Sequence, residues 1–287
     1  MALEWLAWVL GATVIWGFGT LASKPGTERL GSRTMGIGTT LIEGAAFGLI
    51  GLALPRGALP PDPLYAAAAV SAGALGAIGY LFFYEGMRFG TVGLVGTISA
   101  ACPMLTVVLS VAFLGETLGA LQVLGIALIM LCILVLAYDP RRGSATRRAA
   151  VLLSLAGFFV WGIWGFLVKA SVDALGEGSL DLLLAAGYLG VTAGYAALPR
   201  RPNGAAAPQG RKTWALGLFV FLAGGLSAVA LTIAYDLGPA AAVAPISGTY
   251  PIIATLAAAA VLKERLDWRI AVALAAFAAG IVLLSGL

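Results

Sequence analysis

Long apolar runs, separated by short polar segments, make up almost the whole of the 287-residue chain. A helix that crosses a bilayer needs about 20 mostly apolar residues, and the runs have this length. The polar segments between them are too short to form a soluble domain. We therefore predict an all-α polytopic membrane protein with ten transmembrane helices. The predicted helices span residues 5–22, 34–54, 64–87, 91–114, 118–138, 149–170, 180–198, 213–235, 240–262 and 268–287.

The predicted connections contain residues that end helices. Examples are Lys24-Pro25-Gly26 and Pro60-Pro61-Asp62-Pro63, because proline and glycine interrupt helical backbone. The first apolar run has no preceding basic segment and is longer than the core of a signal peptide. We expect it to be retained as a helix.

Composition excludes several classes of function. Hydrophobic residues make up 61% of the chain and charged residues 10%, against about 25% charged in a soluble domain. The chain has no histidine and no phosphate-binding glycine-rich loop, so we expect no metal, no cofactor, no ATPase motor and no enzymatic activity. The two cysteines, Cys102 and Cys132, lie in apolar runs and are interpreted as packing residues. The lipid bilayer, and not nucleic acid, is the expected surrounding of this basic chain.

The positions of the basic residues predict how the chain is oriented. With ten helices, 15 of the 17 lysines and arginines fall on one side of the membrane, leaving Arg56 and the helix-end Lys169 on the other. Cytoplasmic loops carry the excess of positive charge. Both termini are therefore predicted on the outer side, in a bacterial inner (plasma) membrane.

The two halves of the chain are similar to each other. A shift of 148 positions aligns Ile15-Trp16-Gly17-Phe18 with Ile163-Trp164-Gly165-Phe166, and the same shift aligns further residues in the fourth and fifth predicted helices of each half and in the turn between them. Each half contains five predicted helices, so the second half would enter the membrane in the opposite sense, as in many secondary transporters. We predict a first repeat at 1–138, a basic cytoplasmic linker at 139–148 and a second repeat at 149–287. The further aligned pairs are Ser99 with Ser247, Pro103 with Pro251, Glu116 with Glu264 and Leu118 with Leu266.

These features resemble the drug/metabolite transporter superfamily, in its ten-helix EamA-type branch. The most specific motifs are Gly115-Glu116-Thr117-Leu118 and its partner Lys263-Glu264-Arg265-Leu266. The resemblance covers the whole chain and, within the superfamily, is greatest to bacterial aromatic amino-acid exporters. It implies export of small metabolites without ATP, by alternating access around a central cavity.

Two prolines in mid-helix mark candidate binding points. Pro103 and Pro251 lack the N–H that would bond the carbonyls of Ser99 and Ser247. A bare carbonyl is costly in hydrocarbon, so each could meet a substrate group. The alternative is a kink satisfied locally by serine hydroxyls and by Thr97 or Thr249.

Aromatic residues suggest a cavity wall. Tyr80, Phe83 and Tyr84 share one face of the third predicted helix, and Trp16, Trp164 and Tyr250 lie at comparable depth. Such rings could stack on a flat or cationic substrate. The alternative is that they pack against helices or face lipid.

Glu43 lies near the middle of the second predicted helix, where a carboxylate is costly and is a functional candidate. It could bind a substrate amino group, exchange protons or remain neutral and hydrogen-bonded. Among the other charged residues, Glu85 is expected to pair with Arg88, and Lys169 to meet a substrate carboxylate or reach the outer surface. Glu116 and Glu264 are expected to accept N–H groups at the start of the next helix.

The combined interpretation is a secondary transporter for small amphipathic metabolites, foremost aromatic or other large amino acids. It requires a small-molecule substrate and is compatible with a monomer. A sugar-phosphate or nucleotide-sugar exchanger of the same superfamily is the alternative, although it would need several basic residues at depth. The chain lacks the acidic cluster or histidine base expected of an intramembrane enzyme. A receptor or scaffold would not explain the inverted repeat.

Overall fold

The computed structural model describes residues 4–55, 62–90, 92–137, 146–199, 210–254, 257 and 268–285. Regular secondary structure in these ranges is entirely helical. Residues 250–254 continue as helix after a two-residue turn that follows α10. The helices are α1 (Glu4–Leu30), α2 (Ser32–Ala53), α3 (Pro63–Phe89), α4 (Val92–Ala100), α5 (Pro103–Phe113), α6 (Ala120–Ala137), α7 (Thr146–Leu175), α8 (Glu177–Ala197), α9 (Arg211–Leu237), α10 (Ala240–Ser247) and α12 (Trp268–Ser285).

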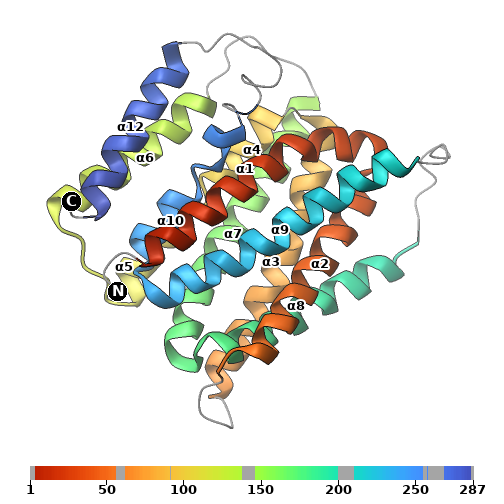
Figure 1. The fold of residues 1–287 in the computed structure, drawn as a ribbon, viewed down its shortest axis with the longest axis horizontal. Helices are drawn as coiled ribbons and strands as arrows, with labels where there is room; N and C mark the ends of the chain where they lie inside the picture. The colour runs from red at the N-terminus through yellow and green to blue at the C-terminus, as the bar shows by residue number, and fades with distance from the viewer. Residues whose placement is uncertain are drawn as a thin grey trace.

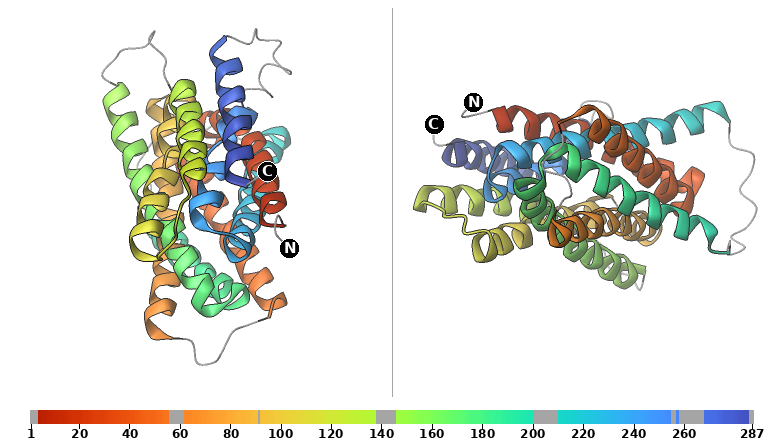
Figure 2. Two further views of the ribbon diagram at one scale, coloured as in Figure 1. Left: turned by 90° about the vertical axis from the view of Figure 1, so that its left-hand side faces the viewer. Right: turned by 90° about the horizontal axis from the view of Figure 1, so that it is seen from below.

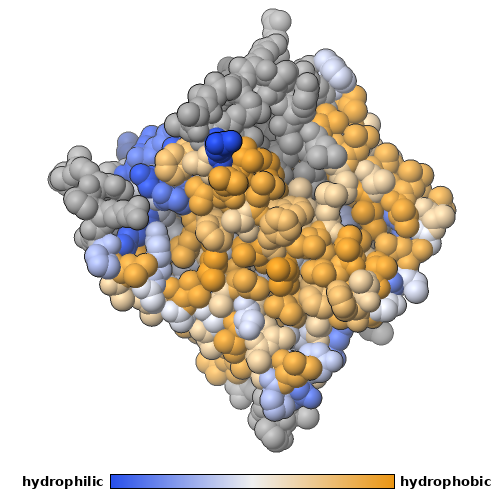
Figure 3. Space-filling model, turned by 180° about the vertical axis from the view of Figure 1, so that it is seen from behind, coloured by the Kyte–Doolittle hydropathy of each residue, from blue (hydrophilic) through white to orange (hydrophobic). Residues whose placement is uncertain are grey.

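Within the described ranges, six helices are long and apolar enough to cross a membrane: α1, α2, α3, α7, α8 and α9. Shorter apolar helices cover Ile98–Phe113, Ala120–Leu131 and Ala240–Ala254. Large hydrophobic side chains are exposed on the outside, including Leu49, Val108 and Phe113. Hydrophobic residues also cover most of the described surface in Figure 3, while hydrophilic residues gather toward its margins. This surface suits lipid rather than water.

The helices pack in pairs drawn from the two halves of the chain. α1 packs along α9, and α3 packs along α7. α2 packs against α8 and α9, and α3 also contacts α8. α6 and α12 lie side by side at one side of the molecule, and α2 and α8 lie at the other (Figure 1, Figure 2).

Glycine lets the backbones of α3 and α8 touch. A Cβ placed on Gly187 would lie 2.2 Å from the carbonyl oxygen of Val70, and one on Gly73 would lie 2.2 Å from that of Leu184. Helices in membranes associate through such small residues, because lipid is as apolar as a side chain and gives no hydrophobic driving force.

The first helix is longer than predicted, because Lys24-Pro25-Gly26 lies inside α1 and not in a connection. Proline removes one backbone hydrogen bond, but α1 continues past it, and neighbouring residues make further contacts. The hydroxyls of Ser23 and Thr27 bond backbone carbonyls one turn back, and Gly26 packs against Met35. The helix ends instead at Gly31, whose φ of 83° is easily adopted only by glycine.

Two of the predicted helices are broken rather than merely kinked. The segment predicted at 91–114 divides into α4 and α5 at Ala101 and Cys102, directly before Pro103. The segment predicted at 240–262 breaks at Gly248 and Thr249, directly before Tyr250 and Pro251. α5 and α10 contact each other. The breaks therefore bring irregular backbone into the interior of the molecule.

Candidate functional site

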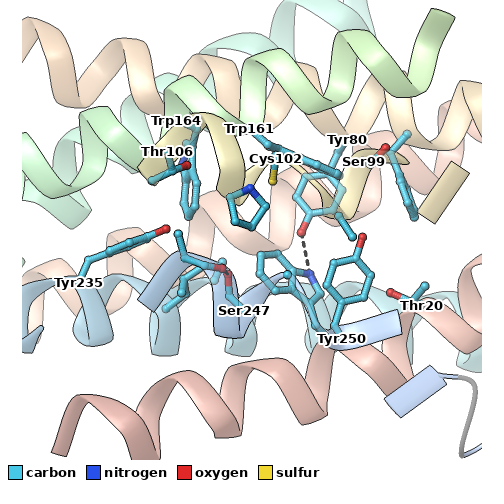
Figure 4. A pocket seen from close by; sticks show the side chains of 18 of the residues that line it. Thr20, Tyr80, Ser99, Cys102, Thr106, Trp161, Trp164, Tyr235, Ser247 and Tyr250 are labelled. Atoms are coloured by element: carbon cyan, nitrogen blue, oxygen red, sulfur yellow. Dashed lines mark hydrogen bonds between the residues drawn. The ribbon is translucent and has the colours of Figure 1, made fainter. Parts of the chain in front are cut away.

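A central cavity lies between the two broken helices and the long helices α1, α3, α7, α8 and α9 (Figure 4). Its empty volume is about 740 Å³, including open space at its mouth. The side chains that line it among the described residues are uncharged. They are Trp16, Thr20, Tyr80, Phe83, Ser99, Ala100, Cys102, Pro103, Thr106, Trp161, Trp164, Tyr188, Ala228, Leu231, Tyr235, Ala244, Ser247 and Tyr250, together with Gly248.

Eight of the lining residues are aromatic, and several of their rings contact one another. Trp161 lies edge-on to Tyr80, with 5.1 Å between ring centroids, and 5.7 Å from Phe83. Trp16 lies 5.8 Å from Tyr250. Such ring contacts hold flat surfaces in fixed orientations. The cavity therefore presents rigid aromatic faces.

Hydrogen bonds fix some of these rings. The Trp16 indole N–H donates to the Tyr80 hydroxyl at 3.1 Å, the dashed line in Figure 4. The Trp161 N–H donates to the Gly76 carbonyl at 3.2 Å. Gly79 makes room for this tryptophan, because a Cβ there would lie 2.3 Å from the Trp161 nitrogen.

Two other polar atoms at the cavity are buried without a hydrogen-bond partner among the described residues. They are the Trp164 indole nitrogen and the Ser99 hydroxyl oxygen. A buried polar group left unpaired costs roughly 1–3 kcal/mol. Both groups can donate, and because they lie toward opposite ends of the cavity in Figure 4, each would need its own acceptor.

The prediction that Pro103 exposes the Ser99 carbonyl is wrong in its detail. The chain tightens at the break, and the Cys102 N–H donates to the Ser99 carbonyl at 3.2 Å. In the second broken helix the Ser247 hydroxyl donates to the Ala244 carbonyl at 2.8 Å. The unpaired polar group at Ser99 is thus its hydroxyl, not its carbonyl.

Glu43 lies behind the cavity wall and not in it. It is fully buried, and its carboxylate faces the hydroxyls of Tyr80 and Tyr188, which do line the cavity. Neither contact has the geometry of a full hydrogen bond. A Cβ at Gly224 would lie 2.8 Å from Glu43 Oε1, so this glycine leaves the space for the carboxylate. A charge on Glu43 would act on the cavity through the two tyrosines.

Of the remaining predicted residues, some line the cavity and others pack behind the lining side chains. Tyr84 is buried behind Tyr80, stacks on it at 6.1 Å and shares a 2.8 Å hydrogen bond with Thr39. Pro251 follows the second break but does not line the cavity. Cys102, predicted to be a packing residue, does line it. The side chain of Cys132 lies outside the described residues.

Sequence reasoning did not identify several lining residues. Trp161 could have been found, because it precedes Trp164 by three residues and so shares its helix face. Tyr188 and Tyr235 carried no such signal. They reach the cavity because α8 and α9 pack against the first half of the chain.

The charged residues outside the cavity have structural partners. Glu85 pairs with Arg88, as predicted, and also accepts from the Ser32 hydroxyl. Lys169 is buried and bonds Asp173 at 2.7 Å and the Tyr235 carbonyl at 2.9 Å. It is therefore neither free for a substrate carboxylate nor extended to the surface.

Glu116 binds a different helix from the one predicted. Its two carboxylate oxygens accept the backbone N–H groups of Ala240 and Ala241, each at 2.8 Å. These groups begin α10, in the other half of the chain, and not the next helix α6. An anion at a helix N-terminus satisfies its free N–H groups and the helix dipole. Glu264 lies outside the described residues.

Comparisons with known proteins agree with this architecture. A solved structure described only as "Crystal structure of protein" superposes with a TM-score of 0.71 at 18% identity, over 99% of this chain and 98% of that one. At this identity the likeness concerns the fold alone. A search of curated protein sequences gave no significant match.

The sequence profile of the EamA-like transporter family matches the chain twice, at residues 3–138 and 148–286. The two matches together cover nearly the whole chain. Members of this family are multi-pass membrane proteins that move small molecules, and they are transporters rather than enzymes. The chain belongs to the EamA-like transporter family and is a membrane transporter of the drug/metabolite superfamily.

Proposed function

We propose that this transporter exports aromatic or other large amino acids. The observation that carries the proposal is the cavity wall, in which uncharged aromatic rings surround two unpaired hydrogen-bond donors. Flat apolar side chains fit the rings, and the Trp164 N–H fits a carboxylate. Amino acids with large side chains combine these two features in one small molecule.

Each part of such a substrate has a candidate partner. The carboxylate accepts from the Trp164 N–H, while the Ser99 hydroxyl, toward the other end of the cavity in Figure 4, is left for a second polar group. The ammonium group lies toward Tyr80 and Tyr188, where ring faces attract cations and Glu43 stands directly behind the hydroxyls. Trp16, Phe83, Ser247 and Tyr250 complete the binding surface. Glu43 acts in this scheme as a positioning residue.

The uncharged lining weighs against a sugar-phosphate or nucleotide-sugar substrate. A phosphate group taken out of water requires charge-assisted hydrogen bonds, foremost from arginine or lysine. Lys24 and Lys169 are the lysines nearest in sequence to lining residues of α1 and α7, and each already bonds backbone carbonyls at a helix end.

The proposal includes ten membrane-crossing helices in two inverted repeats, 1–138 and 149–287, joined by the basic linker 139–148. The helix packing supports the repeats, because the shift of 148 residues pairs α1 with α7, α2 with α8 and α3 with α9. The contact between α1 and α9 then corresponds to the contact between α7 and α3, and the contact between α3 and α8 corresponds to that between α9 and α2. Two lysine hydrogen bonds have equivalent acceptors, although the lysines themselves are 145 and not 148 positions apart. Lys24 bonds the Met87 carbonyl near the end of α3, and Lys169 bonds the Tyr235 carbonyl, 148 positions after Met87, near the end of α9.

The cavity lies between these proposed repeats, with one broken helix from each beside it. Rocking of one repeat against the other would open the site to each side of the membrane in turn. The positions of the basic residues favour termini on the outer side of a bacterial inner membrane. A single chain contains the complete site, so a monomer suffices.

Counterflow in liposomes tests the proposed substrate class. Vesicles that contain the purified protein are preloaded with unlabelled tryptophan, phenylalanine, glycine or a hexose phosphate, and entry of labelled tryptophan is measured. We expect tryptophan and phenylalanine to drive labelled uptake, and glycine and hexose phosphate to fail. Counterflow driven by the hexose phosphate, or none with the aromatic amino acids, would contradict the proposal.

A further inference from the structure

Two buried carboxylates outside the cavity have no role in the binding scheme. Glu177 is the first residue of α8, and Asp181 follows one helical turn later on the same face. Their exposed fractions are 9% and 0%. All four carboxylate oxygens lack a hydrogen-bond partner among the described residues. Sequence reasoning did not single out either residue.

The surroundings of this pair contain more negative than positive charge. From α9, the Thr232 hydroxyl lies beside both carboxylates, and the half-buried Asp236 acts on Glu177. From α7 come Lys169 and Asp173, but these two bond each other. From α2, the Leu54 and Pro55 carbonyls face Gly178, and Glu43 lies farther along against Tyr188. α3 presents the uncharged Val70 and Gly73 to α8.

Two ionised carboxylates cannot be stable at this place without a positive partner. Each desolvated charge costs several kcal/mol, and two like charges in one site raise the cost further. A single proton removes one charge and supplies a donor to the other carboxylate. The N-terminal turn of α8 stabilises the negative charge on Glu177, which leaves the deeper Asp181 to hold the proton.

We propose that Glu177 and Asp181 form a proton-binding site that holds one proton between two carboxyl groups. The proton comes from a hydronium ion of the solvent at the α7–α8 turn, which becomes water; it forms the O–H bond on Asp181 and leaves one negative charge on the pair. Its release to the same water restores the second charge. The consequence for transport rests on the proposed function.

The site is connected to the cavity through α9. Thr232, beside the two carboxylates, follows Leu231 directly and precedes Tyr235 by three residues, and both of these line the cavity. Protonation lowers the negative charge that α8 presents to Asp236 of α9 and lets the two helices pack closely, whereas two charges on α8 repel Asp236 and draw water between the helices. We therefore expect the rate of substrate exchange to depend on pH through this pair.

Infrared difference spectroscopy of the purified full-length protein tests proton binding without any need for transport. Spectra recorded between neutral and acidic pH should contain a C=O band from a protonated carboxyl group that Asp181→Asn removes. In Glu177→Gln the band should remain, with its midpoint at lower pH, because the neighbouring negative charge is gone. Asp62→Asn is the control, since it removes an exposed carboxylate and asparagine caps α3 equally well.

Tryptophan counterflow, with equal pH on both sides, tests the consequence for transport. The wild-type rate should follow one titration, in which occupancy of the proton site changes about tenfold per pH unit beyond its midpoint. Asp181→Asn should be insensitive to pH, and Asp62→Asn should behave as wild type. An unchanged carboxyl band in Asp181→Asn would overturn the proton site.

Two further results would also overturn the proposal. One is loss of pH dependence in Glu43→Gln but not in Asp181→Asn, which would assign the proton to Glu43. The other is a tryptophan counterflow rate that depends on the sodium concentration and not on pH. If wild type exchanges no amino acid, the proposed function fails while the infrared result still decides the proton site.

Discussion

Among single residues, the three tryptophans at the cavity differ in how their N–H groups are used. Trp16 and Trp161 donate to protein acceptors, while the Trp164 N–H has no partner among the described residues. The first two therefore hold the wall in place, and Trp164 keeps a donor for a ligand. The same shift of 148 residues pairs Trp16 with Trp164, so equivalent positions have acquired different roles.

Trp164→Phe should weaken substrate binding while leaving the fold intact. Phenylalanine keeps a ring but has no N–H, and the loss of one hydrogen bond, worth about 0.5–1.5 kcal/mol, lowers affinity roughly two- to tenfold. Equilibrium binding of labelled tryptophan to the purified protein measures this change. Trp214→Phe, on the exposed surface of α9, should bind as wild type. Equal affinity in both variants would exclude Trp164 as a ligand.

The sequence indicated part of this site because rare residues recur at one spacing. Trp16, Trp164, Ser99 and Ser247 were found in this way, and all four line the cavity. Tyr188 was not found, because its position depends on which helices pack together across the two halves. Glu43 was singled out as a mid-helix carboxylate, but sequence alone could not place it behind two tyrosines.

At the scale of helices, close backbone packing fixes how α3 and α8 cross. Gly187→Ala should destabilise the protein by about 1–3 kcal/mol, as overpacking does, because the new Cβ would meet the Val70 carbonyl. Gly190→Ala, one turn away on the same helix, has nothing within 4 Å of its Cβ position. Thermal unfolding in detergent should show a lower midpoint for Gly187→Ala only. Equal midpoints would contradict this packing.

Glu116 joins the two halves of the chain at the start of α10. Glu116→Ala should cost about 1–2 kcal/mol, the range for loss of a helix cap, and should weaken tryptophan binding because α10 carries Ser247 into the cavity. Glu28→Ala removes an exposed carboxylate whose surface ion pair contributes little. Thermal unfolding and binding would be measured for both variants. A Glu116→Ala protein with unchanged binding would limit Glu116 to a role in stability.

Helix bounds could be predicted where an apolar run ends, but not where tertiary contacts determine where the helix ends. Pro25 was interpreted as the end of a helix, yet α1 continues to Leu30, with Gly26 packed against Met35 of α2. The mid-helix prolines were read correctly as irregularities. How far each helix separates into two could not be predicted, because the backbone bonds at the break depend on the packing around it.

For the whole molecule, the distribution of charge predicts the orientation in the membrane. Cysteines introduced into the basic linker 139–148, in a variant lacking Cys102 and Cys132, should react in intact cells only with a membrane-permeable reagent. A cysteine placed at residue 58, in the connection between α2 and α3, should also react with an impermeant one. The opposite pattern would reverse the orientation and the direction assigned to export.

The central claim is that the aromatic cavity is the path of the substrate, and tryptophan counterflow by cavity variants tests it most directly. Trp16→Ala, Tyr80→Ala and Trp164→Ala each remove a lining ring, and Trp214→Ala removes an exposed ring on α9. With all four proteins monodisperse and equally inserted, we expect counterflow to fall at least severalfold in the first three and to remain at the wild-type rate in the fourth. Wild-type rates in all three cavity variants would show that the substrate does not pass through this cavity.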